Sequence, residues 1–215
     1  MLRRSILAVA PLVVAAAPLA AQQQADACAA IAETEVGYWA EFDLSDIPDA
    51  EVSSLRFALI ERPEEANNLW YEFSAQTNQG PVVIQLDVPG WPFETEDVTG
   101  VIMKAAGQPA MRLPQQMISM MQQQMGPNPM VEFSEKCMAS DYVGTESLEV
   151  PAGTFSAVHI KNADDGSEAW INPDVPFGIV KGTAPEGGVL LLREFGTDAK
   201  NSIPEEPQTM PGMGG

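Results

Sequence analysis

The chain is 215 residues long and strongly acidic: 30 Asp and Glu residues outnumber 11 Lys and Arg residues and give a formal net charge of -19. That charge repels polyanions and the basic residues are nowhere clustered, so we expect no nucleic acid as a partner. Docking on an anionic membrane through a polybasic patch is disfavoured for the same reason. The acidic residues are dispersed along the chain, which is typical of a solubilising surface.

The N-terminus has the pattern of a secretory signal peptide. Two arginines precede an apolar run over residues 5–19, which is interrupted by prolines and is shorter than the roughly 20 residues that span a bilayer. Ala20 and Ala21 then supply small residues for cleavage, so we expect residues 1–21 to be removed and the protein to be exported to the periplasm or the medium. Cys28 lies beyond this point, which argues against lipid attachment, and no later segment resembles an integral membrane segment.

Export makes the two cysteines informative. Cys28 and Cys137 are predicted to form a disulfide, because an oxidising compartment favours pairing. Its loop of roughly 110 residues would contribute about 4 to 5 kcal/mol in the chain-entropy description. Two buried free thiols are the alternative. A redox or metal site is disfavoured because there is no CxxC spacing and only one histidine, so no metal and no cofactor are predicted.

The remaining sequence predicts one β-rich domain over residues 22–202, followed by a tail over residues 203–215 whose Pro and Gly content predicts disorder. Short apolar runs separated by turn residues predict strands at Val36–Leu44, Leu55–Glu61, Asn68–Thr77 and Pro81–Val88, with about five more after Cys137. The expected fold is α+β and mainly antiparallel β: a curved sheet or incomplete β-barrel of about nine strands, with a central helical insertion on its concave face.

The central insertion is expected over residues 95–108 and 113–126, where the two-residue alternation is lost. In the second segment, methionines at i, i+3, i+4 and i+8 share one helix face: Met117, Met120, Met121 and Met125. Three interpretations stay open for this stripe: packing on the sheet, lining an apolar pocket, or binding Cu(I) through sulfur. A stripe that extends over more than two turns converges poorly on one ion.

Histidine occurs once, at His159, within a predicted hairpin series. A turn at Pro151–Gly153 leads into a strand in which His159 is a central residue, at the surface or lining a groove. No GxSxG motif and no Ser/His/Asp set accompany it, so no catalytic residue and no enzyme activity are predicted. Residues 162–168 superficially resemble a calcium loop, but they lack EF-hand spacing and fit a hairpin turn.

One segment carries a resemblance to known proteins. "VPAGTFSAVHI", "AWINPDVPFGIVKG" and "LLREFG", within Leu148–Gly196, resemble the C-terminal half of a poorly characterised family of secreted bacterial β-sheet proteins. That family is similar to the LolA/LolB-like lipoprotein carriers. The resemblance implies a strongly curved antiparallel sheet wrapped over helices, with an apolar cavity able to hold acyl chains. Val175, Pro176 and Gly178 would shape the chain between strands.

Two main functional hypotheses follow. The first is an exported binding module that holds a lipid or other apolar ligand between the sheet and the Met-rich helix, with candidate ligand-binding residues Met117, Met120, Met121, Trp39, Trp70 and Trp170. The alternative is a structural or interaction protein of the cell envelope that binds an envelope protein and no small molecule. A continuous apolar pocket would favour the first hypothesis, and a helix that plugs it would favour the second.

Overall fold

The computed structural model describes residues 17–47, 51–62, 68–124 and 129–210. Residues 1–16 of the expected signal peptide, Met125 of the methionine stripe and residues 211–215 of the expected tail lie outside the described residues. Residues 17–21 form the start of the first helix.

One twelve-stranded sheet runs through the described part of the chain, in the order β12-β6-β5-β4-β3-β2-β1-β11-β10-β9-β8-β7. Its neighbours pair antiparallel, except β12 with β6. The strands are β1 (Trp39–Ser45), β2 (Val52–Glu61), β3 (Leu69–Thr77), β4 (Gly80–Val88), β5 (Gly100–Ala105), β6 (Met111–Arg112), β7 (Asp141–Val150), β8 (Gly153–Lys161), β9 (Glu168–Ile171), β10 (Ile179–Thr183), β11 (Val189–Gly196) and β12 (Gln208–Thr209).

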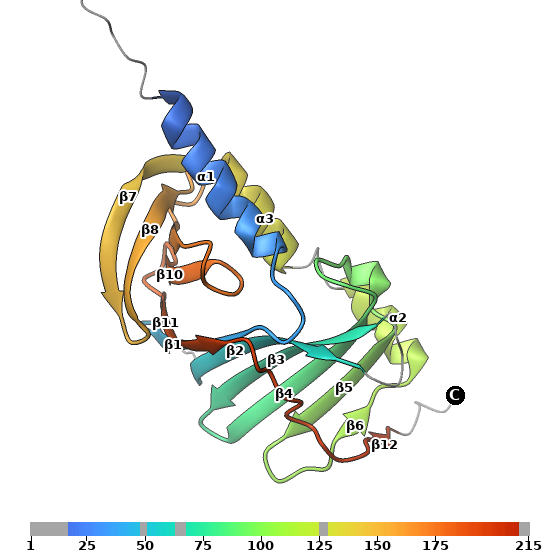
Figure 1. The fold of residues 1–215 in the computed structure, drawn as a ribbon. Helices are drawn as coiled ribbons and strands as arrows, with labels where there is room; N and C mark the ends of the chain where they lie inside the picture. The colour runs from blue at the N-terminus through green and yellow to red at the C-terminus, as the bar shows by residue number, and fades with distance from the viewer. Residues whose placement is uncertain (1–16, 48–50, 63–67, 125–128, 211–215) are drawn as a thin grey trace, which may run out of the picture.

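The sheet is strongly curved and does not close into a barrel. In Figure 1, β7 and β8 rise at one side while β2 to β6 lie across the bottom, and the helices α1 (Ala17–Ala32) and α3 (Pro129–Ala139) lie along the open side. The helix α2 (Gln115–Gln124) lies beside β5, at the other end of the sheet. This confirms the expected mainly antiparallel, curved sheet, but the count of about nine strands is too low.

The helices differ from the expectation in two respects: one expected helix is absent, and two helices were not expected. Residues 95–108 form a short 3-10 helix, Thr95–Asp97, and then β5, instead of a helix. Alternation is absent in β5 because both of its faces are covered: Val101 belongs to the main core and Ile102 to a second cluster on the outer face. The helices α1 and α3 were not predicted, since Ala-rich α1 lacks a strong apolar stripe and α3 follows the last predicted helix directly.

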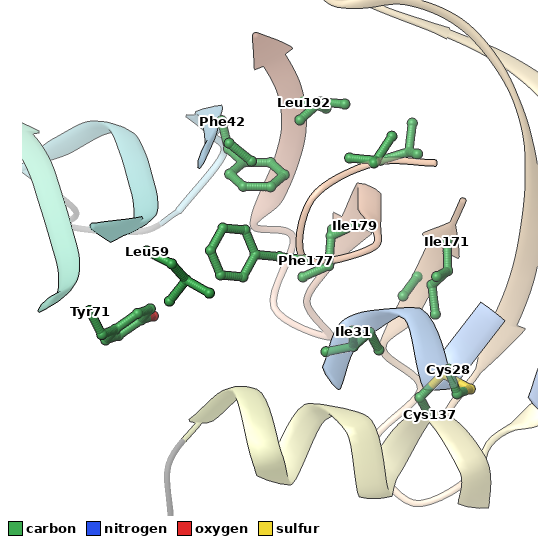
Figure 2. Close-up of a cluster of buried hydrophobic side chains, with 14 of the residues drawn as sticks. Cys28, Ile31, Phe42, Leu59, Tyr71, Cys137, Ile171, Phe177, Ile179 and Leu192 are labelled. Carbon is green, nitrogen blue, oxygen red and sulfur yellow. A yellow bond between two sulfur atoms is a disulfide. The ribbon is translucent and has the colours of Figure 1, made fainter. Parts of the chain in front are cut away.

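The main core fills the centre of the concave face (Figure 2). Its central side chain is Phe177, which is 0% exposed and contacts the rings of Phe57 and Trp91. The segment between β9 and β10 carries it inward: the Phe177 N–H donates to Thr34 Oγ1 at 2.9 Å. The following Gly178 has a φ of +74°, and a Cβ there would lie 3.1 Å from Ile31 Cγ1. The "VPFG" segment is thus a structural plug.

The outer face of β2 to β6 is covered by the C-terminal strap, which we define as residues 197–210. Ile203 is 3% exposed and packs in the outer cluster with Trp70 and Ala58. Further along the strap, the Gln208 N–H donates to the Ala110 carbonyl at 2.8 Å and β12 pairs with β6. Disorder from residue 203 is the expectation from composition; residues 203–210 instead lie on the sheet, since one buried isoleucine and backbone pairing hold them there.

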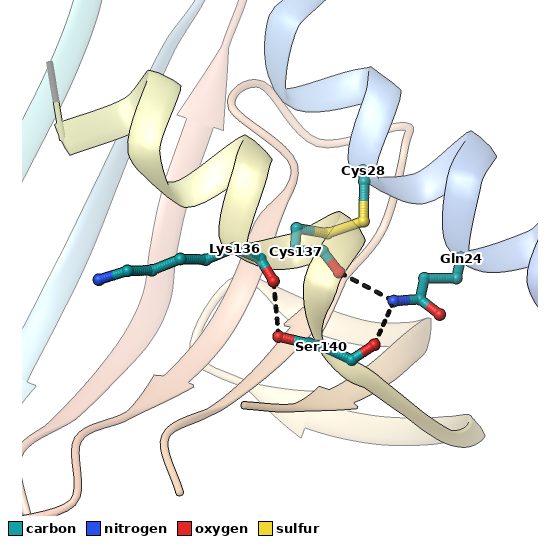
Figure 3. Close-up of a disulfide and its surroundings, with 5 residues drawn as sticks. All are labelled: Gln24, Cys28, Lys136, Cys137 and Ser140. Carbon is teal, nitrogen blue, oxygen red and sulfur yellow. Dashed lines mark hydrogen bonds between the residues drawn. A yellow bond between two sulfur atoms is a disulfide. The ribbon is translucent and has the colours of Figure 1, made fainter. Parts of the chain in front are cut away.

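The disulfide between Cys28 and Cys137 is confirmed and joins α1 to α3, with a Cα–Cα distance of 5.8 Å (Figure 3). Gln24 reinforces this connection, because its Nε2 donates to the carbonyls of Cys137 at 2.8 Å and Ser140 at 2.7 Å. Carbonyls at a helix C-terminus lack partners within the helix, so the Gln24 amide caps α3. Both contacts fix the position of α3.

We predict that replacing both cysteines by serine lowers the free energy of unfolding by about 2 to 5 kcal/mol, because the bond closes a loop with a sequence separation of 109 residues. Urea denaturation of the variant and the oxidised wild type measures the difference. The reduced wild type is the control and should match the variant. A change below about 0.5 kcal/mol would mean that α3 is held without the bond.

Candidate functional site

A cavity of about 630 Å³ lies between α3 and the concave face of β8 to β11. We call it the α3 pocket. Its floor is a row of residues that the strand registers place side by side. Leu44 pairs with Leu190 and Leu190 with Gly182, and the row continues through Ala169 and Ile160. Paired residues on neighbouring strands point to the same face of a sheet, so all five face the pocket that they line.

The shape of this row explains the hollow. Its central members, Gly182 and Ala169, are small, while its outer members are Leu and Ile side chains. The adjacent inward positions carry large buried side chains, among them Phe42, Leu192 and Ile171, which pack with Phe177 and leave no such space. The pocket therefore forms where side-chain volume is missing at one end of the concave face.

The roof of the α3 pocket comes from α3, which contributes Phe133, Lys136 and Cys137. Among the described elements, α3 packs chiefly on α1 and only weakly on the strands. The helix is thus held above the sheet by its partner helix and the disulfide (Figure 3). The space beneath it remains open.

The mouth of the α3 pocket is polar. Lys136, Asp165 and Glu186 are exposed, and Glu168 is partly exposed. Lys136 pairs with Glu132 at 2.8 Å, and this carboxylate raises the pKa of Lys136. The hydrogen bonds from Ser167 lower the pKa of Asp165.

Glu168 has partners on the other side of the sheet. Lys161 Nζ lies 2.7 Å from Glu168 Oε1, and His159 Nε2 lies 2.8 Å from Oε2. These two contacts, that of Lys161 first, lower the pKa of Glu168. At neutral pH the carboxyl groups of Asp165 and Glu168 are therefore expected to be ionised.

His159 belongs to a packed cross-strand cluster on the face opposite the pocket floor. Its ring stacks on Trp170 with centroids 4.1 Å apart, and its Nδ1 lies 3.3 Å from Glu146 Oε1. The Trp170 indole N–H donates to the same Glu146 oxygen, and the Lys181 ammonium lies 4.2 Å from the Trp170 ring centroid. The turn at residues 151–152 that precedes this strand is confirmed. The contacts indicate a structural role for His159.

The six candidate ligand-binding residues from the sequence are not brought together, and the described lining of the α3 pocket includes none of them. Met117 and Met121, on α2, pack against the main core, whereas Met120 on the same helix is 42% exposed. Trp39 and Trp70 lie in the outer cluster. Trp170 points away from the pocket, on the face opposite to its neighbour Ala169.

The residues that do line the pocket carried little signal of their own. Gly182 and Ala169 are ordinary strand residues in the sequence, and only the pairing of β9 with β10 places them side by side. Phe133 and Lys136 lie on the helix that was missed. Pro129 at the first helical position and the Glu132–Lys136 spacing are the sequence signals that could have predicted α3 and, with it, these two residues.

A second cavity, also of about 630 Å³, lies on the outer face between the sheet and the C-terminal strap. Beside it is a buried polar network centred on Glu72, which is 0% exposed. Glu72 accepts hydrogen bonds from Arg56 at 3.0 Å and Gln85 at 2.8 Å, and from the backbone and hydroxyl of Ser202 at 3.1 and 2.6 Å. These groups satisfy one another, so the network fixes the strap to the sheet.

We predict that Glu72→Ala lowers the free energy of unfolding by about 3 to 5 kcal/mol, because it leaves buried partners without an acceptor. It should also release the strap, so that trypsin cuts faster at the exposed Lys200. Chemical denaturation and timed proteolysis with mass spectrometry measure the two effects. Glu149→Ala, at an exposed strand position, is the matched control, and equal cleavage rates for both variants would contradict the assigned role.

Within the described residues, no helix combines the length and apolar character needed to cross a membrane. No group of three or more His, Cys, Asp and Glu side chains is arranged there to hold a metal ion.

No protein-family model and no curated protein sequence matches the chain. Among solved structures, the chain is similar to a Parabacteroides distasonis protein provisionally described as a lipoprotein, with 12% identity and a TM-score of 0.36, over 76% of this chain and 96% of that one. It is also similar to a Bacteroides fragilis protein provisionally described as exported, with a YmcC-like fold, at 11% identity and a TM-score of 0.33, over 76% and 97%. Likenesses at these TM-scores carry no argument about function.

Proposed function

We propose that the protein is an exported binding protein that holds the apolar part of a small amphiphile in the α3 pocket. The observation that carries the proposal is the hollow itself: Gly182 and Ala169 leave room between flanking apolar side chains, under a helix held away from the sheet. Export is proposed on the signal-peptide pattern at the N-terminus. Binding and not catalysis is proposed because two of the four ionisable groups at the mouth, Lys136 and Glu168, already pair with structural partners.

The volume and chemistry of the pocket fit such a ligand. Small-molecule sites have volumes of roughly 300 to 1,000 Å³ and are mostly apolar with a few polar groups. The α3 pocket, at about 630 Å³, lies within this range. Water gains few hydrogen bonds over a floor of Leu44, Leu190 and Ile160, so an apolar chain that displaces it would be favoured.

A second candidate function is a structural or interaction protein of the cell envelope. The observation that favours it is the plug: Phe177 and Ile31 fill the centre of the concave face, where a large lipid cavity would lie. The two candidates differ in a measurable way. Only a binding protein needs the remaining hollow at the α3 pocket to be occupied.

Native mass spectrometry of the mature protein from its own exported fraction, followed by extraction and lipid analysis, separates the two candidates. A stoichiometric compound with an apolar chain supports the binding proposal. A bare polypeptide that also binds no apolar probe on incubation supports the structural alternative.

We predict that Gly182→Leu blocks the pocket and weakens binding of N-phenyl-1-naphthylamine, an uncharged apolar fluorophore, about tenfold or more, equivalent to about 1.4 kcal/mol. A Cβ at Gly182 would meet Leu190 at 3.7 Å, an ordinary contact, so the new side chain enters the pocket without backbone strain. Fluorescence titration measures the dissociation constant.

Gly144→Leu is the matched control, because it makes the same change in a strand where a Cβ has no neighbour within 4 Å. It should bind the probe as the wild type does. Unchanged binding by folded Gly182→Leu would place the probe elsewhere and remove the main support for the α3 pocket.

A further inference from the structure

We infer that the α3 pocket selects amphiphiles whose polar end is cationic and discriminates against those whose polar end is a carboxylate or another anion. The inference rests on the proposed binding function and adds the class of ligand. It follows from the charged residues around the mouth of the pocket; the floor is apolar.

The charged residues that line the pocket are unequal in number. Asp165, Glu168 and Glu186 are acidic, and Lys136 is the one basic residue among the described lining residues. They lie on three separate segments: the β8–β9 turn with the start of β9, the β10–β11 connection, and α3. Asp165 and Glu186 therefore flank the opening from the sheet side and the ammonium group approaches from the helix, while the Glu168 carboxylate is paired with Lys161 and His159 on the other side of the sheet.

The Lys136 ammonium group already has a carboxylate partner, so it would bind an anionic ligand only weakly. Lys136 Nζ already lies 2.8 Å from Glu132 Oε1, a pair one helical turn apart on α3. Asp165 is close enough to add an electrostatic attraction of its own. A ligand carboxylate at the mouth would compete with two fixed carboxylates for one cation and would be repelled by both.

A cationic head group would be attracted by the carboxylates at the mouth. Asp165 lines the pocket and is exposed, and the Ser167 N–H holds its carboxylate in place by donating to Oδ1 at 2.8 Å. Glu186 is exposed in the connection between β10 and β11 and has room to approach a bound head group. The formal charge of -19 on the whole chain adds an attractive field at longer range.

The orientation of the ligand follows from the same asymmetry. Ile160, Ile179 and Ala169 are buried at the floor and offer no charged partner, so a charged end would be desolvated there without compensation. The chain would therefore lie along the floor with its polar end at the mouth. Charge selectivity at the mouth then becomes selectivity of the whole site.

The test uses three probes with the same twelve-carbon chain, each below its micellar concentration: dodecyltrimethylammonium, dodecyl maltoside and dodecanoate. Isothermal titration of the mature, disulfide-bonded protein at low ionic strength should give the tightest binding for the cation and the weakest for the anion. We expect about a tenfold difference between these two, which is the size expected for a few partly exposed charge contacts. The difference should shrink in about 0.5 M salt because of screening.

The double variant Asp165→Asn/Glu186→Gln should reduce the ratio of cation to anion affinity about threefold or more, in line with the weak contribution of each exposed pair. Asn at residue 165 can still accept the hydrogen bond from Ser167, so the turn is preserved. The control Glu149→Gln/Glu194→Gln makes the same change in charge at exposed residues outside the pocket and should leave the ratio as in the wild type.

The outcomes separate the inference from the proposal on which it rests. If none of the three probes binds, including the uncharged maltoside, the binding function itself is wrong. If the probes bind but the anion binds as tightly as the cation, the binding function stands and the charge selectivity is overturned. An equal loss of selectivity in both double variants would attribute it to the overall charge of the protein and overturn the role of the mouth.

Discussion

The pairing of α3 with α1 is the constraint on which the α3 pocket depends. A curved antiparallel sheet presents a concave apolar face that has to be covered, and here α1 covers the centre directly through Ile31 and its neighbours. The second helix packs on α1 instead of the sheet and is fixed there by the Cys28–Cys137 bond and the Gln24 amide. Because α3 is held by another helix, it can bridge a hollow without filling it.

Several features of the fold could be predicted from the sequence because each has a local cause. The runs Val36–Leu44 and Asn68–Thr77 alternate or end at turn residues; β3 lies within the second run, and β1 lies within the first except for its last residue, Ser45. The disulfide followed from two cysteines and a signal-peptide pattern. The strand β5 was mistaken for a helix because a strand covered on both faces loses the alternation on which strand prediction relies.

The candidate site could not be predicted from local sequence patterns. A pocket is an absence of side-chain volume, and its position depends on the register between neighbouring strands. The methionines on α2 formed a conspicuous pattern, yet Met117 and Met121 pack in the core. Gly182 and Ala169 formed no pattern and define the hollow. Likewise, the strap residue Ile203 is the one β-branched apolar residue in a Pro- and Gly-rich tail, and only the outer cluster against which it packs explains its burial.

The two faces of the sheet now suggest different roles for its polar groups. On the outer face, Glu72 and His159 are surrounded by fixed partners, and such satisfied groups hold strands and strap in one arrangement. On the concave face, the core around Phe177 is filled and polar groups occur at the mouth of the α3 pocket, where Asp165 and Glu186 face solvent. The His159 cluster lies behind the floor of the α3 pocket, and such a fixed support behind a small, open hollow is expected of a preformed site, since the sheet need not reorganise to admit a ligand.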